Sequence, residues 1–336
     1  MASSRIPRIV LGDVGNVLAP LAPGPLGRKG GSDTYVHICR GDTPGPLGTN
    51  GDWADVGALG KVIQPIILLK SNQCACNRDL TLDELAKIYS KQSRQICALY
   101  LPFINAAFKE YNITTCLRKS HFLAQLGHES GELRHTSEIL RKGVKESDVY
   151  DGYKGRGLIQ ITYESNYRAY GKRVKRSFLG SDRTELEKPQ WATDSAGWYW
   201  TSGSGKDLNC LADNNDLLAI TARVNGGFNG FEDRRKRLEK SFEVLNVRKC
   251  KNVIVTAQSF CPFPHSAIFN NRVYAFAWGC WNDTRTGKTG VVKSLDERKL
   301  GYKRYLELRE SGKKSNNSHY GFSPEKMLSL AKEGVK

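Results

Sequence analysis

The tripeptide His-Glu-Ser at 128–130 ends a stretch whose apolar residues recur at helical spacing. We therefore predict a helix from Cys116 to about Ser130, and Gly131 allows the chain to turn after it. Apolar surroundings favour the neutral form of a carboxyl group, and a neutral carboxyl group can give its proton to a leaving oxygen atom. The residue types and their placement thus make Glu129 a candidate general acid.

Two further polar strings follow in the chain. Residues 153–162 read Tyr-Lys-Gly-Arg-Gly-Leu-Ile-Gln-Ile-Thr and are followed by Asn-Tyr at 166–167. Residues 225–230 read Asn-Gly-Gly-Phe-Asn-Gly and are followed by Asp-Arg at 233–234. With the first motif, and in this order, these strings resemble those of glycoside hydrolase family 19, which comprises chitinases and phage-type endolysins. The resemblance covers roughly residues 80–245 and implies a mainly α, lysozyme-like, two-lobed catalytic domain.

The resemblance gives Glu129 the role of the family's general acid, and Glu138 that of the second carboxylate in endolysin-like members. Nine residues on one straight helix would place these side chains about 13 Å apart on opposite faces. An inverting glycosidase needs a separation of roughly 6.5–9.5 Å. Glu138 can therefore act only if the helix ends after Glu129 and the chain folds back. Glu132 is the alternative second carboxylate, since it lies near Glu129 if the helix continues.

The resemblance also implies polar residues that bind substrate or orient the acid and the attacking water. Arg234 is expected to pair with a nearby carboxylate, and His128 to lie on the helix face or in the groove. The tyrosines at 153, 163, 167 and 170 are candidates to line a sugar groove through their ring faces. The full candidate binding set is Gln160, Thr162, Asn166, Tyr167, Asn225, Arg234 and His128.

The motifs do not indicate a metal or a cofactor. A zinc-binding His-Glu-x-x-His helix would need histidine four residues after His128, where the chain has Glu132. The nine cysteines are scattered, and the one close pair, Cys74 and Cys76, has no companion pair at zinc spacing. We expect the thiols to be buried singly or joined in a few disulfides.

The charge balance favours an anionic partner. The chain has 51 basic and 34 acidic residues, a formal net charge of +17. Its basic runs, such as 172–176 and 234–237, are dispersed as on solvated helix faces, so a nucleic-acid-binding protein is the weaker interpretation. Peptidoglycan, with its acidic peptides, suits this charge better than neutral chitin. No apolar run is long enough to cross a bilayer.

We therefore predict a muralytic glycoside hydrolase that cuts a β-1,4 bond between amino sugars by an inverting two-carboxylate mechanism. A chitinase would use the same chemistry on another polymer. A lytic transglycosylase is the other alternative, because the strings at 129–130 and 157–161 also resemble that family. It would leave anhydro-sugar ends, whereas a hydrolase leaves reducing ends.

Composition divides the chain into three parts. Residues 1–76 are rich in Gly and Pro and are expected to form a small irregular or β region, a candidate targeting or delivery segment. Residues 77–248 are expected to form the catalytic domain. Residues 249–336 are expected to form a mixed α/β extension, with strand-like segments at 253–255 and 273–278 and helices at 295–308 and 324–330, interpreted as a binding module or a packing appendage. Residues 1–18 lack the pattern of a standard signal peptide. We expect a monomer, made in the cytoplasm, that reaches the wall after lysis or dedicated export, with an inhibitor protein if it is a toxin.

Overall fold

The structure, a computed structural model, describes residues 74–254, 257, 259–311 and 317–336 and is mainly helical there, as predicted. The expected irregular or β region at 1–76 lies outside the described residues except for 74–76. The α-helices are α1 (Leu82–Ile88), α2 (Arg94–Glu110), α3 (Cys116–Glu129), α4 (Glu164–Val174), α5 (Pro189–Trp198), α6 (Leu208–Asp213), α7 (Leu217–Asn225), α8 (Phe231–Val244), α9 (Arg272–Asn282), α10 (Leu295–Glu310) and α11 (Pro324–Gly334).

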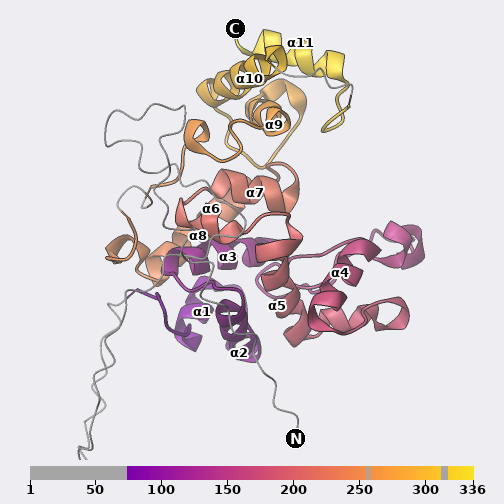
Figure 1. Cartoon of the computed structure of the whole chain (residues 1–336), viewed down its shortest axis with the longest axis vertical. Helices are drawn as coiled ribbons and strands as arrows, with labels where there is room; N and C mark the ends of the chain where they lie inside the picture. The colour runs from indigo at the N-terminus through magenta and orange to yellow at the C-terminus, as the bar shows by residue number, and fades with distance from the viewer. Residues whose placement is uncertain (1–73, 255–256, 258, 312–316) are drawn as a thin grey trace, which may run out of the picture.

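Helix α3 is the central element, and it carries Glu129 as its last residue. The side chain of Thr115 caps the start of α3 by accepting a hydrogen bond from the Arg118 amide, which explains why α3 begins at Cys116. All residues of 116–127 are buried, because α8 packs along it and α6 and α7 contact it as well. Figure 1 shows α3 in the middle of the molecule, with α1 and α2 on one side and α6 and α7 on the other.

The polar residues of α3 are buried with partners, as the interior of a protein requires. Arg118 pairs with Asp213 through two hydrogen bonds of 2.8 and 2.5 Å. His121 hydrogen-bonds to Asn215 at 2.8 Å. These contacts fix the rotation of α3 about its axis, and so the direction in which its C-terminal residues point. Figure 1 shows α4, with the segments around it, projecting to one side of this body.

The described part of the C-terminal region is helical, so the expectation of a mixed α/β extension is wrong there. Residues 273–278, predicted as strand-like, lie in α9, whose start Asn271 caps by accepting from two amides. The β-prone run fails because Ala275 and Gly279, one helical turn apart, form a face that packs closely against Gly301 of α10. The segment at 253–254, also predicted as a strand, is irregular. The helices predicted at 295–308 and 324–330 are confirmed as α10 and α11.

Helices α9, α10 and α11 pack on one another. The Trp278 ring of α9 lies edge-on to Phe231, the first residue of α8, with centroids 5.6 Å apart. The Glu232 amide donates to the Gly290 carbonyl at 3.0 Å, which joins the C-terminal helices to the residues after the Asn-Gly-Gly string. The division of the chain at 248–249 stays a prediction. None of the described helices combines the length and the apolar character needed to cross a membrane.

Candidate active site

The chain turns back after Glu129, as the spacing argument requires. Helix α3 ends at Glu129, and three successive residues, Gly131, Glu132 and Leu133, have positive φ angles of 58°, 62° and 68°. The Ser130 hydroxyl donates to Leu126 O at 2.6 Å and accepts from Leu133 N at 2.8 Å. Ser130 thus ties the turn to the last turn of the helix, and the following chain leaves α3 at once.

Glu129 is held by an arginine on α8. Arg234 is fully buried, and its Nη2 donates to Glu129 Oε1 while its Nη1 donates to Gln125 Oε1 one turn earlier on α3. The Glu129 side chain keeps 19% of its surface exposed, so its carboxyl group is accessible from one side. No described residue donates to its second oxygen, Oε2. The expected pairing of Arg234 with a carboxylate is therefore present, and Arg234 orients Glu129 from beneath.

His128 belongs to a second ion network between the same two helices. Its Nδ1 donates to Asp233 at 2.7 Å, and Arg237 Nε donates to the same carboxylate oxygen at 2.6 Å. Burial and the charge of Arg234 lower the pKa of His128, although the bond to Asp233 opposes them. Burial raises the pKa of Asp233, but the hydrogen bonds from His128 and Arg237 lower it overall. The lowered pKa favours the neutral imidazole, and its hydrogen bond to Asp233 helps to position α8 against α3.

Glu132, the alternative second carboxylate, is buried, and both of its side-chain oxygens accept hydrogen bonds from within the protein. Its side chain is only 6% exposed. Oε1 accepts from Arg237 at 2.7 Å, and Oε2 accepts from the Lys91 amide at 2.8 Å. Both oxygens are therefore used to hold the turn after α3, and a water molecule or a sugar has little access to them.

Glu138 lies on the returning chain beside the second motif. Its amide donates to Gly155 O at 2.8 Å, and the Gly155 amide donates to Glu138 Oε2 at 3.0 Å. Neighbouring bridges pair Ser137 with Arg156 and Arg156 with Ile161. Gly155 has no room for a side chain, because a Cβ atom there would lie 2.9 Å from Gln160 Oε1 and 3.4 Å from Thr162 Oγ1. The glycine thus lets two candidate binding residues come close to the backbone that holds Glu138.

Gln160, Thr162 and Asn166 line up along this segment. Gln160 Nε2 donates to Gly157 O at 2.8 Å, and Thr162 Oγ1 donates to Gln160 O at 3.1 Å. Asn166, in the first turn of α4, donates to Thr162 O at 2.7 Å. All three side chains are partly exposed, so each can still meet a ligand.

The expectation that Tyr167 faces a sugar groove is wrong. Tyr167 is fully buried, its hydroxyl group donates to Lys154 O at 2.6 Å, and it accepts from Arg156 at 3.0 Å. Tyr153 and Tyr170 are buried as well. These aromatic side chains fill the core beneath the second motif, which is the commoner role of aromatics at helical spacing. Only Tyr163, 55% exposed, fits the prediction.

Tyr150 is a candidate that the sequence reasoning missed. It is 43% exposed, and its ring lies edge-on to Tyr163 with centroids 5.1 Å apart. Both residues have positive φ angles, 50° for Tyr150 and 74° for Tyr163, which is unusual for aromatic residues. Strained backbone that presents two exposed rings is a feature of binding sites. No motif marks Tyr150, because the pairing depends on how the loop at 150–163 closes.

Asn225 is the exposed last residue of α7, and its Oδ1 accepts from the Asn229 amide at 3.1 Å. The loop that follows ends at Gly230, whose φ is 68° and whose missing Cβ leaves room for the His128 ring, 2.2 Å from where that atom would be. The Asn-Gly-Gly string thus brings α8, with Asp233 and Arg234, onto the end of α3.

Tyr199 is another neighbour of Glu129 that no motif identifies. Its hydroxyl group donates to Arg223 O at 3.2 Å, and burial together with the charge of Glu129 raises the pKa of Tyr199. Tyr199 starts a short π-helix, Tyr199–Gly203, that continues α5. Such one-turn π segments often occur at functional sites.

Comparisons with known proteins give relatives among glycoside hydrolases. No family model matches the chain. A glycosyl hydrolase family 19 domain-containing protein of Haemophilus influenzae is 28% identical over 173 residues, covering 40% of this chain and 82% of that protein. An endochitinase of Arabidopsis thaliana is 35% identical over 134 residues, 37% of this chain; the chain spans about half, 46%, of that relative's length.

Among solved structures, chitinase C of Streptomyces griseus is similar at 20% identity, with 49% of this chain and 92% of that chain covered and a TM-score of 0.41. The curated relatives point to the same kind of enzyme as the ordered motifs and the carboxylates that follow α3. The chain is therefore similar to glycoside hydrolases of family 19 over 37–40% of its length.

Proposed function

We propose that the chain hydrolyses the β-1,4 bond between amino sugars of peptidoglycan, with Glu129 as general acid and Glu138 as general base. The observation that supports this most directly is the buried Arg234, which fixes a partly exposed Glu129 at the very end of α3. The chain then reverses through three left-handed residues and leads to Glu138. Two carboxylates from one short stretch can in this way face one groove.

Each carboxyl group has a defined task in an inverting reaction. Glu129 gives a proton to the glycosidic oxygen as its bond to the anomeric carbon breaks, and Arg234, bonded to Oε1, leaves Oε2 to carry that proton. A water molecule attacks the anomeric carbon from the opposite face, and Glu138 accepts its proton. The Gly155 amide, which donates to Oε2 of Glu138, stabilises the charged form that a base needs.

The polar side chains beside Glu138 supply binding and orientation. Gln160, Thr162 and Asn166 lie along the segment that pairs with Glu138, where amide and hydroxyl groups can bind sugar hydroxyl and acetamido groups. The exposed rings of Tyr150 and Tyr163 offer apolar faces to a pyranose ring.

Peptidoglycan is preferred as substrate because the chain carries a net charge of +17 and the bacterial wall is anionic. Chitin is the second candidate, because the Arabidopsis relative is an endochitinase. In either case the protein would act outside the cytoplasm, after lysis or dedicated export, and as a monomer. An antibacterial toxin of this kind would also need an inhibitor protein in the producing cell.

The test is digestion of purified peptidoglycan and of chitin oligomers, with the products identified by mass spectrometry and the anomeric configuration by NMR. We expect reducing ends of inverted configuration from peptidoglycan, and a loss of at least about 10²-fold in kcat for Glu129→Gln and Glu138→Gln. Glu164→Gln, at an exposed carboxylate on α4, is the matched control and should keep full activity.

Glu132→Gln separates the two candidate bases, since we expect lower stability but retained kcat. Full activity of Glu129→Gln would contradict the proposal, and anhydro-sugar products would show a lytic transglycosylase instead. Activity on chitin alone would retain the chemistry and change the polymer.

A further inference from the structure

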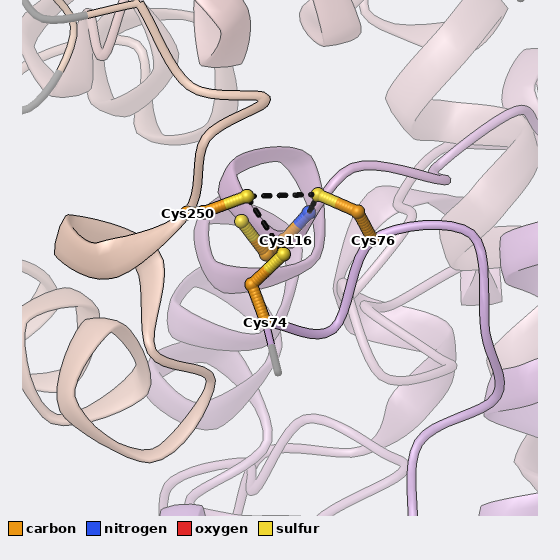
Figure 2. Close-up of side chains that lie close together, drawn as sticks. All are labelled: Cys74, Cys76, Cys116 and Cys250. Carbon is orange, nitrogen blue, oxygen red and sulfur yellow. Dashed lines mark hydrogen bonds between the residues drawn. The ribbon is translucent and has the colours of Figure 1, made fainter. Parts of the chain in front are cut away.

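Four cysteines from three distant segments meet in one place. Cys74 and Cys76 precede α1, Cys116 is the first residue of α3, and Cys250 follows the short helix Val247–Lys249 after α8. Their four Sγ atoms all lie within 4.8 Å of one another. Figure 2 shows all four side chains pointing toward a common centre. The spacing along the chain gave no indication of this site, because the four residues span 176 positions.

The sulfur positions fit one tetrahedral ion better than disulfides. A Zn²⁺ ion with Zn–S bonds of about 2.3 Å holds its sulfur atoms about 3.8 Å apart. The Sγ of Cys250 lies 3.5 Å from that of Cys76, close to this spacing, and 2.7 Å from that of Cys74, which is shorter than it. Both distances are too long for the bond of about 2.05 Å in a disulfide, and none of the four cysteines is in one. Cys74 and Cys76 are also separated by a single residue, which makes a bond between them strained.

The surroundings favour negative charge on the sulfur atoms. The Cys116 amide, at the N-terminus of α3, donates to Cys76 Sγ at 3.1 Å. Lys119, on the next turn of α3, is buried and donates to Ala75 O at 2.7 Å. Arg78 Nε donates to Cys74 O at 3.3 Å. Lys119 and Arg78 therefore brace the turn that carries Cys74 and Cys76 through its backbone carbonyl groups.

We propose that Cys74, Cys76, Cys116 and Cys250 bind one Zn²⁺ ion in a closed, structural tetrathiolate site. On binding, each thiol loses its proton to solvent and forms one Zn–S bond, and no oxidation takes place. Four protein ligands leave no position for water or substrate. The site lies at the opposite end of α3 from Glu129, about 20 Å away along a 14-residue helix.

The ion would join the two helices that build the active site. Cys116 starts α3, and Cys250 lies shortly after α8, which carries Arg234. Cys74 and Cys76 attach the first described residues to both. Because a cross-link between segments 174 residues apart removes many conformations of the unfolded chain, the ion would stabilise the whole catalytic domain. It would not change the chemical step.

The first measurement is the metal content of the full-length chain, purified under reducing conditions without added metal, by inductively coupled plasma mass spectrometry. We expect one zinc ion per chain. Exchange for Co²⁺ should give the visible bands of a tetrahedral cobalt tetrathiolate. Zinc-free protein with all four thiols reactive would overturn the proposal, as would a disulfide among these four found by peptide mapping. Iron in place of zinc would overturn the identity of the ion.

The second measurement uses variants and does not depend on activity. Cys76→Ser and Cys250→Ser should reduce zinc content from one ion per chain to near zero and lower the Tm. Cys97→Ser is the matched control, since Cys97 is buried, as Cys250 is, but lies on α2 outside the cluster. It should retain one zinc ion. If a cluster variant does not fold, chelator-induced loss of zinc from the wild type, with a lower Tm that added zinc restores, decides the question. A Tm unchanged by complete zinc removal would refute the structural role.

Discussion

Replacing Arg234 by Met should destabilise the protein strongly, because it leaves Glu129 without its only described partner. Arg234 is fully buried, and its guanidinium group donates hydrogen bonds to both Glu129 and Gln125. Removing one member of a buried ion pair costs about 3–5 kcal/mol. Glu129 keeps 19% of its side-chain surface in contact with solvent, so we expect the lower end, about 3 kcal/mol. For a folded region of this size that corresponds to a decrease in Tm of about 6–12 °C.

The assay is a double-mutant cycle followed by urea denaturation, with R234M, E129Q and the double variant. Glu129→Gln alone leaves the buried guanidinium without a carboxylate, whereas the double variant leaves neither charge, so the two costs should not add. We expect a coupling energy of about 2 kcal/mol. Costs that add within about 0.5 kcal/mol would refute the pairing. Arg234→Lys keeps the charge but cannot reach both partners, so it should restore only part of the stability.

Three further outcomes follow from other contacts. His121 is fully buried against Asn215 and the Phe242 ring, and burial lowers its pKa to about 4. Its contribution to stability is therefore complete above the ordinary pKa near 6.5, and up to about 3 kcal/mol of stability is lost as the pH falls toward 4. His121→Gln should reduce this loss in unfolding curves measured at several pH values. Gly230→Ala would put a Cβ atom 2.2 Å from the His128 ring and should lower the free energy of unfolding by more than about 2 kcal/mol. Gly226→Ala, at a residue with positive φ but open space, should lower it by about 1 kcal/mol. Equal losses for the two variants would exclude the contact with His128 as the cause. Tyr163→Ala should raise KM about tenfold with little change in kcat if the exposed ring binds sugar, and an unchanged KM would remove it from the site.

Local signals in the sequence predicted the elements that carry the site. The apolar spacing predicted α3, and the Ser-Gly pair after Glu129 marks the turn that the two-carboxylate argument needs. The motif string also predicted that Arg234 meets a carboxylate. These features depend on residues close in sequence, or on a pattern known from a family.

Features that depend on packing between distant segments could not be predicted in the same way. Tyr167 belongs to the motif string and was a candidate groove residue, but Arg156 and the Lys154 carbonyl enclose its hydroxyl group in the core. Residues 273–278 have a β-prone composition, yet close contact with α10 makes them a helix. The four clustered cysteines are nearest neighbours only after α3 and α8 have packed.

The C-terminal helices are best understood as support for the start of α8. Gly227, in the loop after Asn225, lies under Trp281, whose ring would be 3.0 Å from a Cβ there. The Phe228 ring packs edge-on against Trp278, with centroids 4.9 Å apart. Since α8 begins directly after this loop, its first turn, with Asp233 and Arg234, is fixed by contacts to both parts of the chain. The orientation of Glu129 therefore depends on a region that no catalytic motif includes, which favours a packing role for that region over a separate binding module.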